Sequence, residues 1–263
     1  MDVTTLSSLA PWEWPAEAAA VLLSALRSDR RDDPARRLAV ELASSTTVMN
    51  DALAEALLAI LRDPGEAEPV RAAAAISLGP TLEEIGLNWD EFDDIEPPLV
   101  SEGVASAIRR CLQEVYGDAG GSKEVRRRAL EASVRIEEDW HAAAVRAAYD
   151  SGDDDWRVTA VFSMGYVAGF DREIVDALEA GDPRVHGEAV RAAGTWSLPA
   201  AWPHIRPLLT EPVDKPLLLA AIEAAGSIRP AEARDLLADL ALSDDEEIAE
   251  AVADALAMVS GEG

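Results

Sequence analysis

The chain has 263 residues and a formal net charge of -27 at pH 7, and 49% of its residues are hydrophobic although only 5% are aromatic. An acidic surface of this kind repels the phosphate backbone of nucleic acids and anionic membrane surfaces, so we expect neither as a partner. Because the apolar residues are mainly Ala, Leu and Val, close-packed helices are favoured over a sheet.

The first 32 residues precede the repeats described below, and we expect this segment, 1–32, to cap the N-terminal end of the array. Its apolar run is short, lacks a basic leader and is interrupted by Glu17, so it does not resemble a signal peptide. No segment of the sequence reaches the length needed to span a bilayer. The expected location is therefore the cytoplasm.

A ten-residue pattern recurs from residue 33 to the end, over 33–263. It is clearest in "VRAAAAISLG" from Val70, "WRVTAVFSMG" from Trp156, "VHGEAVRAAG" from Val185 and "LLLAAIEAAG" from Leu217, with further copies from Ala35, Val125 and Ile248. The last five copies start 29 to 32 residues apart, about the length of two short helices and two turns. The fifth position is Ala or Val in every copy and shares a helical face with positions one, six and nine. We predict about seven antiparallel helix pairs, in which the first helix of each pair carries the pattern.

Three local features of the pattern carry further predictions. The turns between pairs, such as "GDDD", "GDPR" and "EPVD", are expected to supply N-caps to the next first helix. Glycine ends four copies and predicts a left-handed cap there, at Gly79, Gly165, Gly194 and Gly226. Arginine fills the second position of four copies and is predicted to pair with acidic turn residues of the adjacent pair, at Arg36, Arg71, Arg126 and Arg157.

This pattern resembles the short HEAT repeat, in particular the HEAT-like units named after phycobilisome lyases, and "EPVRAAAAISLG" is the closest match. The "TPLHxA" signature of ankyrin repeats is absent, and the period is short for a tetratricopeptide repeat. The resemblance implies an all-α, right-handed α-solenoid of about seven HEAT-like antiparallel helix pairs. It also implies that the second helices line a concave face.

The sequence shows no constellation of residues typical of catalysis, so we predict no catalytic residue, no cofactor and no metal. Cys111 is the one cysteine and is expected to pack as a small apolar residue. His141 and His204 lie near the starts of second helices, where polar rim residues are favoured over a metal site. The resembled family includes bilin lyases, and a relative, deoxyhypusine hydroxylase, uses His-Glu motifs. None of the three histidines is followed by Glu.

The preferred hypothesis is a non-catalytic scaffold or adaptor that presents a helical groove to a protein or peptide. The alternatives are a bilin-lyase-like enzyme or enzyme subunit, and a purely structural accessory domain. Fold-level analogy does not transfer function, so the lyase alternative has no support beyond the resemblance. The candidate partner-binding residues are Trp89, Phe92, His141, Arg146, Arg172, Asp176, Trp202, Arg206, Arg234 and Asp235.

An acidic insertion at about 80–100 interrupts the second pair and contains "LNWDEFDDIEPP". Two interpretations stay open. Trp89, Phe92 and Ile95 either fold back onto the array or remain available as an acidic and aromatic ligand for a basic partner. We favour packing, because three large apolar side chains left in water would form an adhesive patch.

Overall fold

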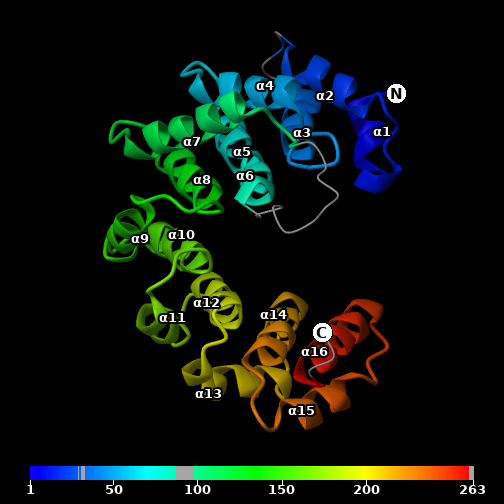
Figure 1. Cartoon of the computed structure of the whole chain (residues 1–263), viewed down its shortest axis with the longest axis vertical. Coiled ribbons are helices and arrows are strands. Elements are labelled where there is room, and N and C mark those ends of the chain that lie inside the picture. Colours follow the sequence, from blue (N-terminus) through cyan, green and yellow to red (C-terminus); the bar gives the residue numbers. More distant parts are fainter. Residues whose placement is uncertain (29, 31–32, 87–97, 261–263) are drawn as a thin grey trace. The chain divides into compact units, whose positions relative to one another are not determined.

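The computed structural model describes residues 1–28, 30, 33–86 and 98–260, and its helices are labelled in Figure 1. Secondary structure within these ranges is helical, without a strand. The predicted all-α class is therefore confirmed. The chain divides into two compact units, Met1–His141 and Ala142–Gly263, and each is described by itself.

The first unit arranges its repeat helices in two layers. Its helices are α1 (Val3–Ser7), η1 (Pro11–Glu13), α2 (Ala18–Leu26), α3 (Pro34–Leu42), α4 (Asp51–Arg62), α5 (Glu68–Ser77), α6 (Gly79–Gly86), α7 (Glu102–Gly117) and α8 (Lys123–Ser133). The pattern-bearing helices α3, α5 and α8 contact one another in chain order, and so do α2, α4 and α7. Each layer therefore consists of alternate helices, as the repeat pattern predicts.

The N-terminal helices pack against the first repeat. Both α1 and α2 contact α3, and the side chains of Leu6 and Leu22 are fully buried. The indole N–H of Trp14 donates to the carbonyl oxygens of Leu6, at 3.0 Å, and Leu9, at 3.3 Å. The contacts of α1 and α2 with α3 attach residues 1–28 to the first repeat. A capping role for the whole array stays a prediction.

The second unit has the same alternation. It contains α9 (His141–Tyr149) from its second residue, then α10 (Asp154–Met164), α11 (Asp171–Ala177), α12 (Pro183–Thr195), η3 (Pro199–Ala201), α13 (Trp202–Ile205), η4 (Arg206–Leu209), α14 (Lys215–Ile228), α15 (Ala233–Leu240) and α16 (Glu246–Ser260). The helices α10, α12, α14 and α16 form one layer in chain order, and α11, α13 and α15 pack against this layer (Figure 1). The first layer is built of longer helices than the second.

Aspartates of the turns cap most of the first helices, as predicted, but α5 begins after Ala67 without a side-chain cap and α8 is capped by Ser122. Asp153 Oδ1 accepts from the backbone N–H of Asp155 at 3.0 Å and of Trp156 at 3.1 Å. The same kind of cap begins α12 at Asp182 and α14 at Asp214. Within the Asp153–Asp155 run, Asp153 is therefore the N-cap of α10, and the other two aspartates lie in its first turn.

The small fifth position of the pattern faces the core. Every copy of it is fully buried, at Ala39, Ala74, Ala129, Ala160, Ala189, Ala221 and Val252. A small residue there lets the neighbouring first helix approach closely, because no long side chain separates the backbones. The predicted helical face is confirmed.

The prediction of left-handed caps at the repeat glycines is wrong. Among the described glycines, positive φ occurs only at Gly152 and Gly169. Gly194 and Gly226 lie inside helices, where a Cβ would stand 2.9 Å from the Cα of Ala224 and of Ala255. Each glycine therefore provides space for the next first helix rather than a backbone turn.

The arginines of the second position bind the preceding helix. In three copies the guanidinium donates to the backbone carbonyl of the residue ten positions earlier. This carbonyl lies near the C-terminus of the preceding helix, where the negative end of the helix dipole stabilises a cation. The pairs are Arg36 with Leu26, Arg71 with Leu61 at 3.0 Å, and Arg126 with Tyr116 at 2.9 Å. The predicted acidic partner is present for Arg36, whose Nη2 lies 2.9 Å from Glu66 Oε2.

The insertion at about 80–100 is described only in part. Residues Gly79–Gly86 form α6, which contacts α5 and α8 and buries Thr81 and Leu82 completely. Trp89 and Phe92 lie outside the described residues, so the choice between packing and partner binding stays open for them.

Candidate functional site

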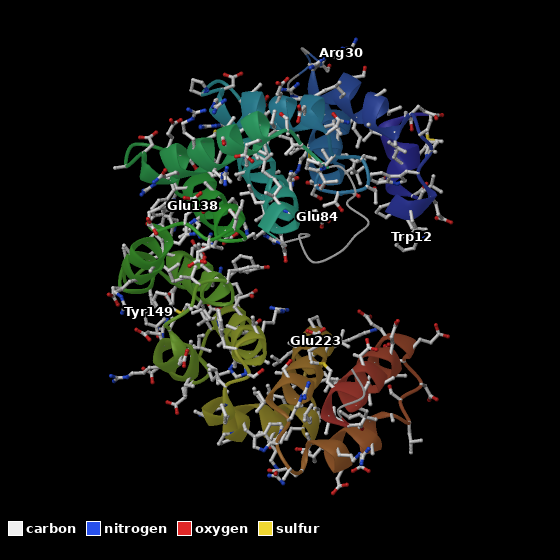
Figure 2. All side chains as sticks on the ribbon, viewed as in Figure 1. Trp12, Arg30, Glu84, Glu138, Tyr149 and Glu223 are labelled. Atoms are coloured by element: carbon white, nitrogen blue, oxygen red, sulfur yellow. The ribbon has the colours of Figure 1, made fainter. Side chains whose placement is uncertain are left out.

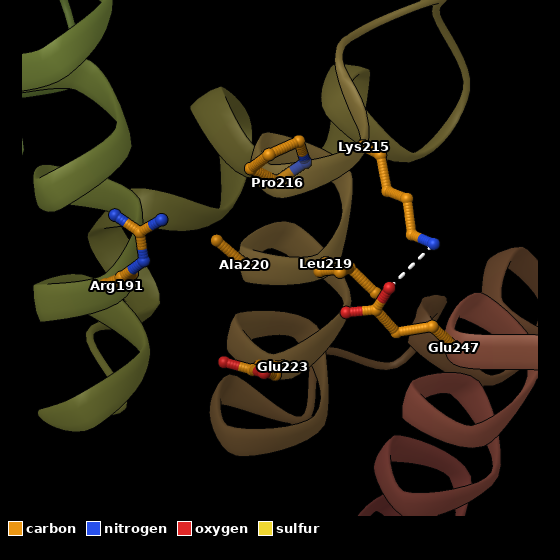
Figure 3. Close-up of a pocket in the computed structure, with 7 residues that line it drawn as sticks. All are labelled: Arg191, Lys215, Pro216, Leu219, Ala220, Glu223 and Glu247. Carbon is orange, nitrogen blue, oxygen red and sulfur yellow. Dashed lines mark ion pairs between the residues drawn. The ribbon is translucent and has the colours of Figure 1, made fainter. Parts of the chain in front are cut away.

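The second unit presents a groove between α12 and α14, shown in Figure 3. Its floor is apolar, with Leu219 and Ala220 on α14, and its edges are charged. Arg191 approaches from α12, whereas Glu223 and Glu247 approach from α14 and α16. We call this the α12–α14 groove; it is lined by Arg191, Lys215, Pro216, Leu219, Ala220, Glu223 and Glu247.

A second groove adjoins it on the other side of α14. Its floor is formed by Leu219, Ala251, Ala255 and Met258, and its rim by carboxylates from both helices. We call this the α14–α16 groove; it is lined by Leu219, Glu223, Ser227, Glu247, Glu250, Ala251, Asp254, Ala255 and Met258. Because Leu219, Glu223 and Glu247 belong to both grooves, the two form one depression along α14.

Local sequence explains why these side chains point outward. Glu223 and Asp254 occupy the seventh position of their repeats, on the helical face opposite the buried fifth position, which is Ala221 in one repeat and Val252 in the other. Glu223 is exposed, and Figure 2 shows it on the surface of α14. Gly226 lets the backbones of α14 and α16 approach closely at Ala255, which lies on the floor of the α14–α16 groove.

Lys215 neutralises one end of the depression. Its Nζ lies 2.8 Å from Asp245 Oδ2 and 2.6 Å from Glu247 Oε2 (Figure 3 shows the contact with Glu247). The hydrogen bond to Asp245 and then the one to Glu247 raise the pKa of Lys215, and the hydrogen bond from Lys215 lowers the pKa of Asp245. This lysine therefore stays charged and bound to its two carboxylates.

The first unit has grooves on its second layer. One lies between α4 and α7 and includes Leu58 and Val104 on its floor with Arg62 at its edge. Another lies beside α2, α3 and α4 and includes Arg27 and Arg36 next to Glu55. The α4–α7 groove is thus lined by second helices, whereas the two grooves of the second unit are lined by first helices.

Comparison with known proteins agrees with the repeat pattern. Residues 172–257 match the family model of HEAT repeats, a range that includes every lining residue of the two second-unit grooves except Met258. Residues 172–257 of the chain therefore contain HEAT repeats. The prediction of a HEAT-repeat protein is confirmed by this match, and no curated protein matches the sequence significantly.

Solved structures with a similar fold include other helical repeat proteins. The complex of CpcE and CpcF of phycocyanin lyase from Nostoc is 18% identical, with a TM-score of 0.57, over 94% of this chain and 98% of that chain. YibA of Escherichia coli is 17% identical, with a TM-score of 0.48, over 94% and 83%. Human deoxyhypusine hydroxylase is 17% identical, with a TM-score of 0.42, over 98% and 88%. The likeness to the lyase complex shows the α-solenoid fold and nothing further.

The candidate residues predicted on the second helices of the HEAT array fall into two groups. On α9 and α11, Arg146 lies 3.1 Å from Glu173, and Arg172 lies 3.8 Å from Asp176. On the more C-terminal second helices, the indole N–H of Trp202 donates to Glu232 at 2.7 Å. Arg206, Arg234 and Asp235 are exposed there. None of the four grooves described above contains a residue of either group.

His141 does not lie at an exposed rim. It is 2% exposed, and its Nε2 lies 3.1 Å from Ser133 Oγ. Burial lowers its pKa from 6.5 to about 4, because the charged imidazolium loses hydration. The residue is therefore neutral in the folded protein near neutral pH and is not exposed to a partner.

Burial of His141 predicts an acid-dependent loss of stability. As pH falls below 6.5 the unfolded chain binds a proton first, so stability is complete above that value and is lost down to about pH 4. Between neutral pH and pH 5 this residue should lower the free energy of unfolding by about 2 kcal/mol. Urea unfolding of the wild-type protein and His141→Gln at both pH values measures the difference. An equal pH dependence in the two proteins would contradict the assignment.

Three further structural findings concern Cys111, metal binding and membrane spans. Cys111 is buried, and burial raises the pKa of its thiol, as expected for a packing residue. The described ranges contain no group of three or more His, Cys, Asp or Glu side chains placed to hold a metal ion. No helix in those same ranges is long and apolar enough to cross a membrane.

The grooves of the second unit were not predicted, because binding was expected on the second helices. There α11 has seven residues and α13 has four, whereas α12, α14 and α16 have 13, 14 and 15. Short helices offer less continuous surface. A signal was present in the sequence, since the third and seventh positions of the pattern carry Leu219 with Glu223 and Glu250 with Asp254.

Proposed function

We propose that this HEAT-repeat protein is an adaptor that binds another protein across the exposed face of α12, α14 and α16. In this proposal the chain carries out no chemistry of its own. One observation carries it: the two grooves along α14 join an apolar floor to a charged rim on three successive repeats. An apolar centre with a polar rim is the usual anatomy of a protein interface.

Rigid packing of the first helices supports a binding role. The repeat glycines and alanines hold α12, α14 and α16 at close contact, so the groove side chains are presented on a fixed surface. Binding to a preorganised surface avoids the entropy cost of ordering loops. The bilin-lyase alternative rests on a fold likeness at 18% identity, and no arrangement of side chains described above favours it.

The test is a charge reversal in the depression. The tagged full-length chain is used to isolate a partner, which is then purified and titrated against the wild-type protein and Glu223→Lys. Because Glu223 lines both grooves and is exposed, the substitution should lower the affinity for the partner by at least about tenfold without unfolding the chain.

The matched control is Asp176→Lys, which reverses an exposed charge on the second helix α11. It should leave the affinity for the partner unchanged. Loss of binding in Asp176→Lys together with full binding in Glu223→Lys would overturn the proposal and favour the second helices. Saturable turnover by the pure chain would contradict its non-catalytic part.

A further inference from the structure

The α14–α16 groove differs from the other grooves in its charge. The α12–α14 groove contains Arg191 and Lys215, the α4–α7 groove contains Arg62, and the groove beside α2 contains Arg27 and Arg36. The α14–α16 groove is lined by four carboxylates and by no basic residue: Glu223, Glu247, Glu250 and Asp254. The absence of basic residues is therefore specific to the lining of this groove and does not simply follow from the net charge of the chain.

Three of these carboxylates lack a cation. Glu247 is bound by Lys215, but within the described part of the chain no basic side chain pairs with Glu223, Glu250 or Asp254. Neighbouring Arg191 is directed to Glu188, 3.1 Å away on its own helix. The carboxylates thus line an apolar floor with negative charge that the fold itself does not neutralise.

This arrangement does not favour helix stability. Glu250 and Asp254 are four residues apart on α16, where like charges repel each other across one helical turn. Asp254 is also too far from the helix N-terminus to gain from the dipole, which acts mainly within the first turn. The charges therefore gain nothing from their own helix and are available to a ligand.

We infer that the α14–α16 groove binds a basic amphipathic segment of a partner protein. Apolar side chains of that segment contact Leu219 and Met258, and its Arg or Lys side chains pair with Glu223, Glu250 and Asp254. Helix-in-groove recognition uses such a combination of apolar anchors and flanking charge. This inference rests on the proposed function and adds the chemical class of the partner.

The probe is a fluorescein-labelled synthetic peptide of about 18 residues, five helical turns, with Leu on one face and Arg or Lys on the other. Two comparison peptides are used. In one, Glu replaces every basic residue; in the other, the same composition is shuffled so that the apolar face is lost. The full-length chain should bind the basic amphipathic peptide saturably, more weakly as salt rises, and should bind neither comparison peptide.

Two matched variants locate the binding. The double variant Glu250→Gln with Asp254→Asn removes two charges from the groove and should lower the affinity for the basic peptide by about tenfold. Asp244→Asn with Glu246→Gln removes two exposed charges near the start of the same helix, outside the groove, and should change the affinity by less than about twofold. Met258→Ala should also weaken binding, although it changes no charge.

The outcomes separate this inference from the proposed function. If peptide binding is weakened equally in both double variants, the attraction is a diffuse one to an acidic protein, and the inference is overturned. A preference for the acidic or the shuffled peptide, or a lack of saturable binding, also overturns it. If the natural partner still requires Glu223 in any of those cases, the proposed function stands. If Glu223→Lys has no effect on the natural partner, the proposed function fails whichever peptide binds.

Discussion

Gly194→Ala is expected to lower the free energy of unfolding by about 1–3 kcal/mol, the usual cost of overpacking a well-packed core. The added Cβ would stand 2.9 Å from the Cα of Ala224, which is a backbone atom of the next first helix and cannot rotate away. The two helices must therefore separate. Urea unfolding followed by circular dichroism measures the loss, and Gly226→Ala, which meets Ala255 at the same distance, should behave in the same way.

The control for this prediction lies in the same helix. A Cβ at Gly187 of α12 meets only the end of the Arg191 side chain, at 3.8 Å. Gly187→Ala should therefore raise the free energy of unfolding by about 0.5–1 kcal/mol, because alanine is the better helix former. Equal stability changes at positions 187 and 194 would show that close contact between the first helices is not what the glycine provides.

The difference between these glycines also shows how far the sequence predicts the fold. The spacing of the pattern was sufficient for the helix pairs and for the buried fifth position, because both follow from the period of the helix. The role of Gly194 was not predicted correctly. Glycine serves either a positive φ or a close approach, and only the position of Ala224 shows that the second applies.

Helix α6 was missed for a related reason. Gly79 ends its copy of the pattern and was predicted to cap the first helix, and Pro80, a residue that often interrupts helices, follows it directly. Pro80 is instead the second residue of a new helix, where the missing N–H costs nothing. Burial of Thr81 and Leu82 against the array depends on tertiary contacts that no local pattern shows.

The candidate site was predictable only in its composition. Exposed acids and apolar residues at the third and seventh positions of the pattern are visible in the sequence, as Leu219, Glu223 and Asp254 illustrate. In the second unit the grooves lie on the layer of longer first helices, and the lengths of the helices in the two layers were not predicted. Pro203 and Pro207 favour short helical segments in the second layer, but their effect on the first layer required the structure.

Arg36→Met is expected to lower the free energy of unfolding by about 3–5 kcal/mol, the cost of breaking a buried ion pair from one side. The side chains of Arg36 and Glu66 are only 10% and 1% exposed, so neither charge is well hydrated in the folded chain. Arg36 also donates to the carbonyl oxygens of Leu26 and Ser28, the latter at 2.7 Å. Its removal leaves a buried carboxylate and two carbonyl groups without this donor.

Two comparisons show whether the charge pair is responsible. Arg37 is the neighbouring residue and pairs with Glu41 at the surface, with side chains 63% and 50% exposed, so Arg37→Met should cost no more than about 0.5 kcal/mol. Arg36→Met combined with Glu66→Met removes both charges, and replacing a buried pair by apolar side chains is often nearly neutral. Urea unfolding of the wild-type protein, Arg36→Met, Glu66→Met and the double variant completes a double-mutant cycle. If the double variant is as unstable as the sum of the two single variants, the hydrogen bonds to Leu26 and Ser28, rather than the ion pair with Glu66, hold α3 against the end of α2.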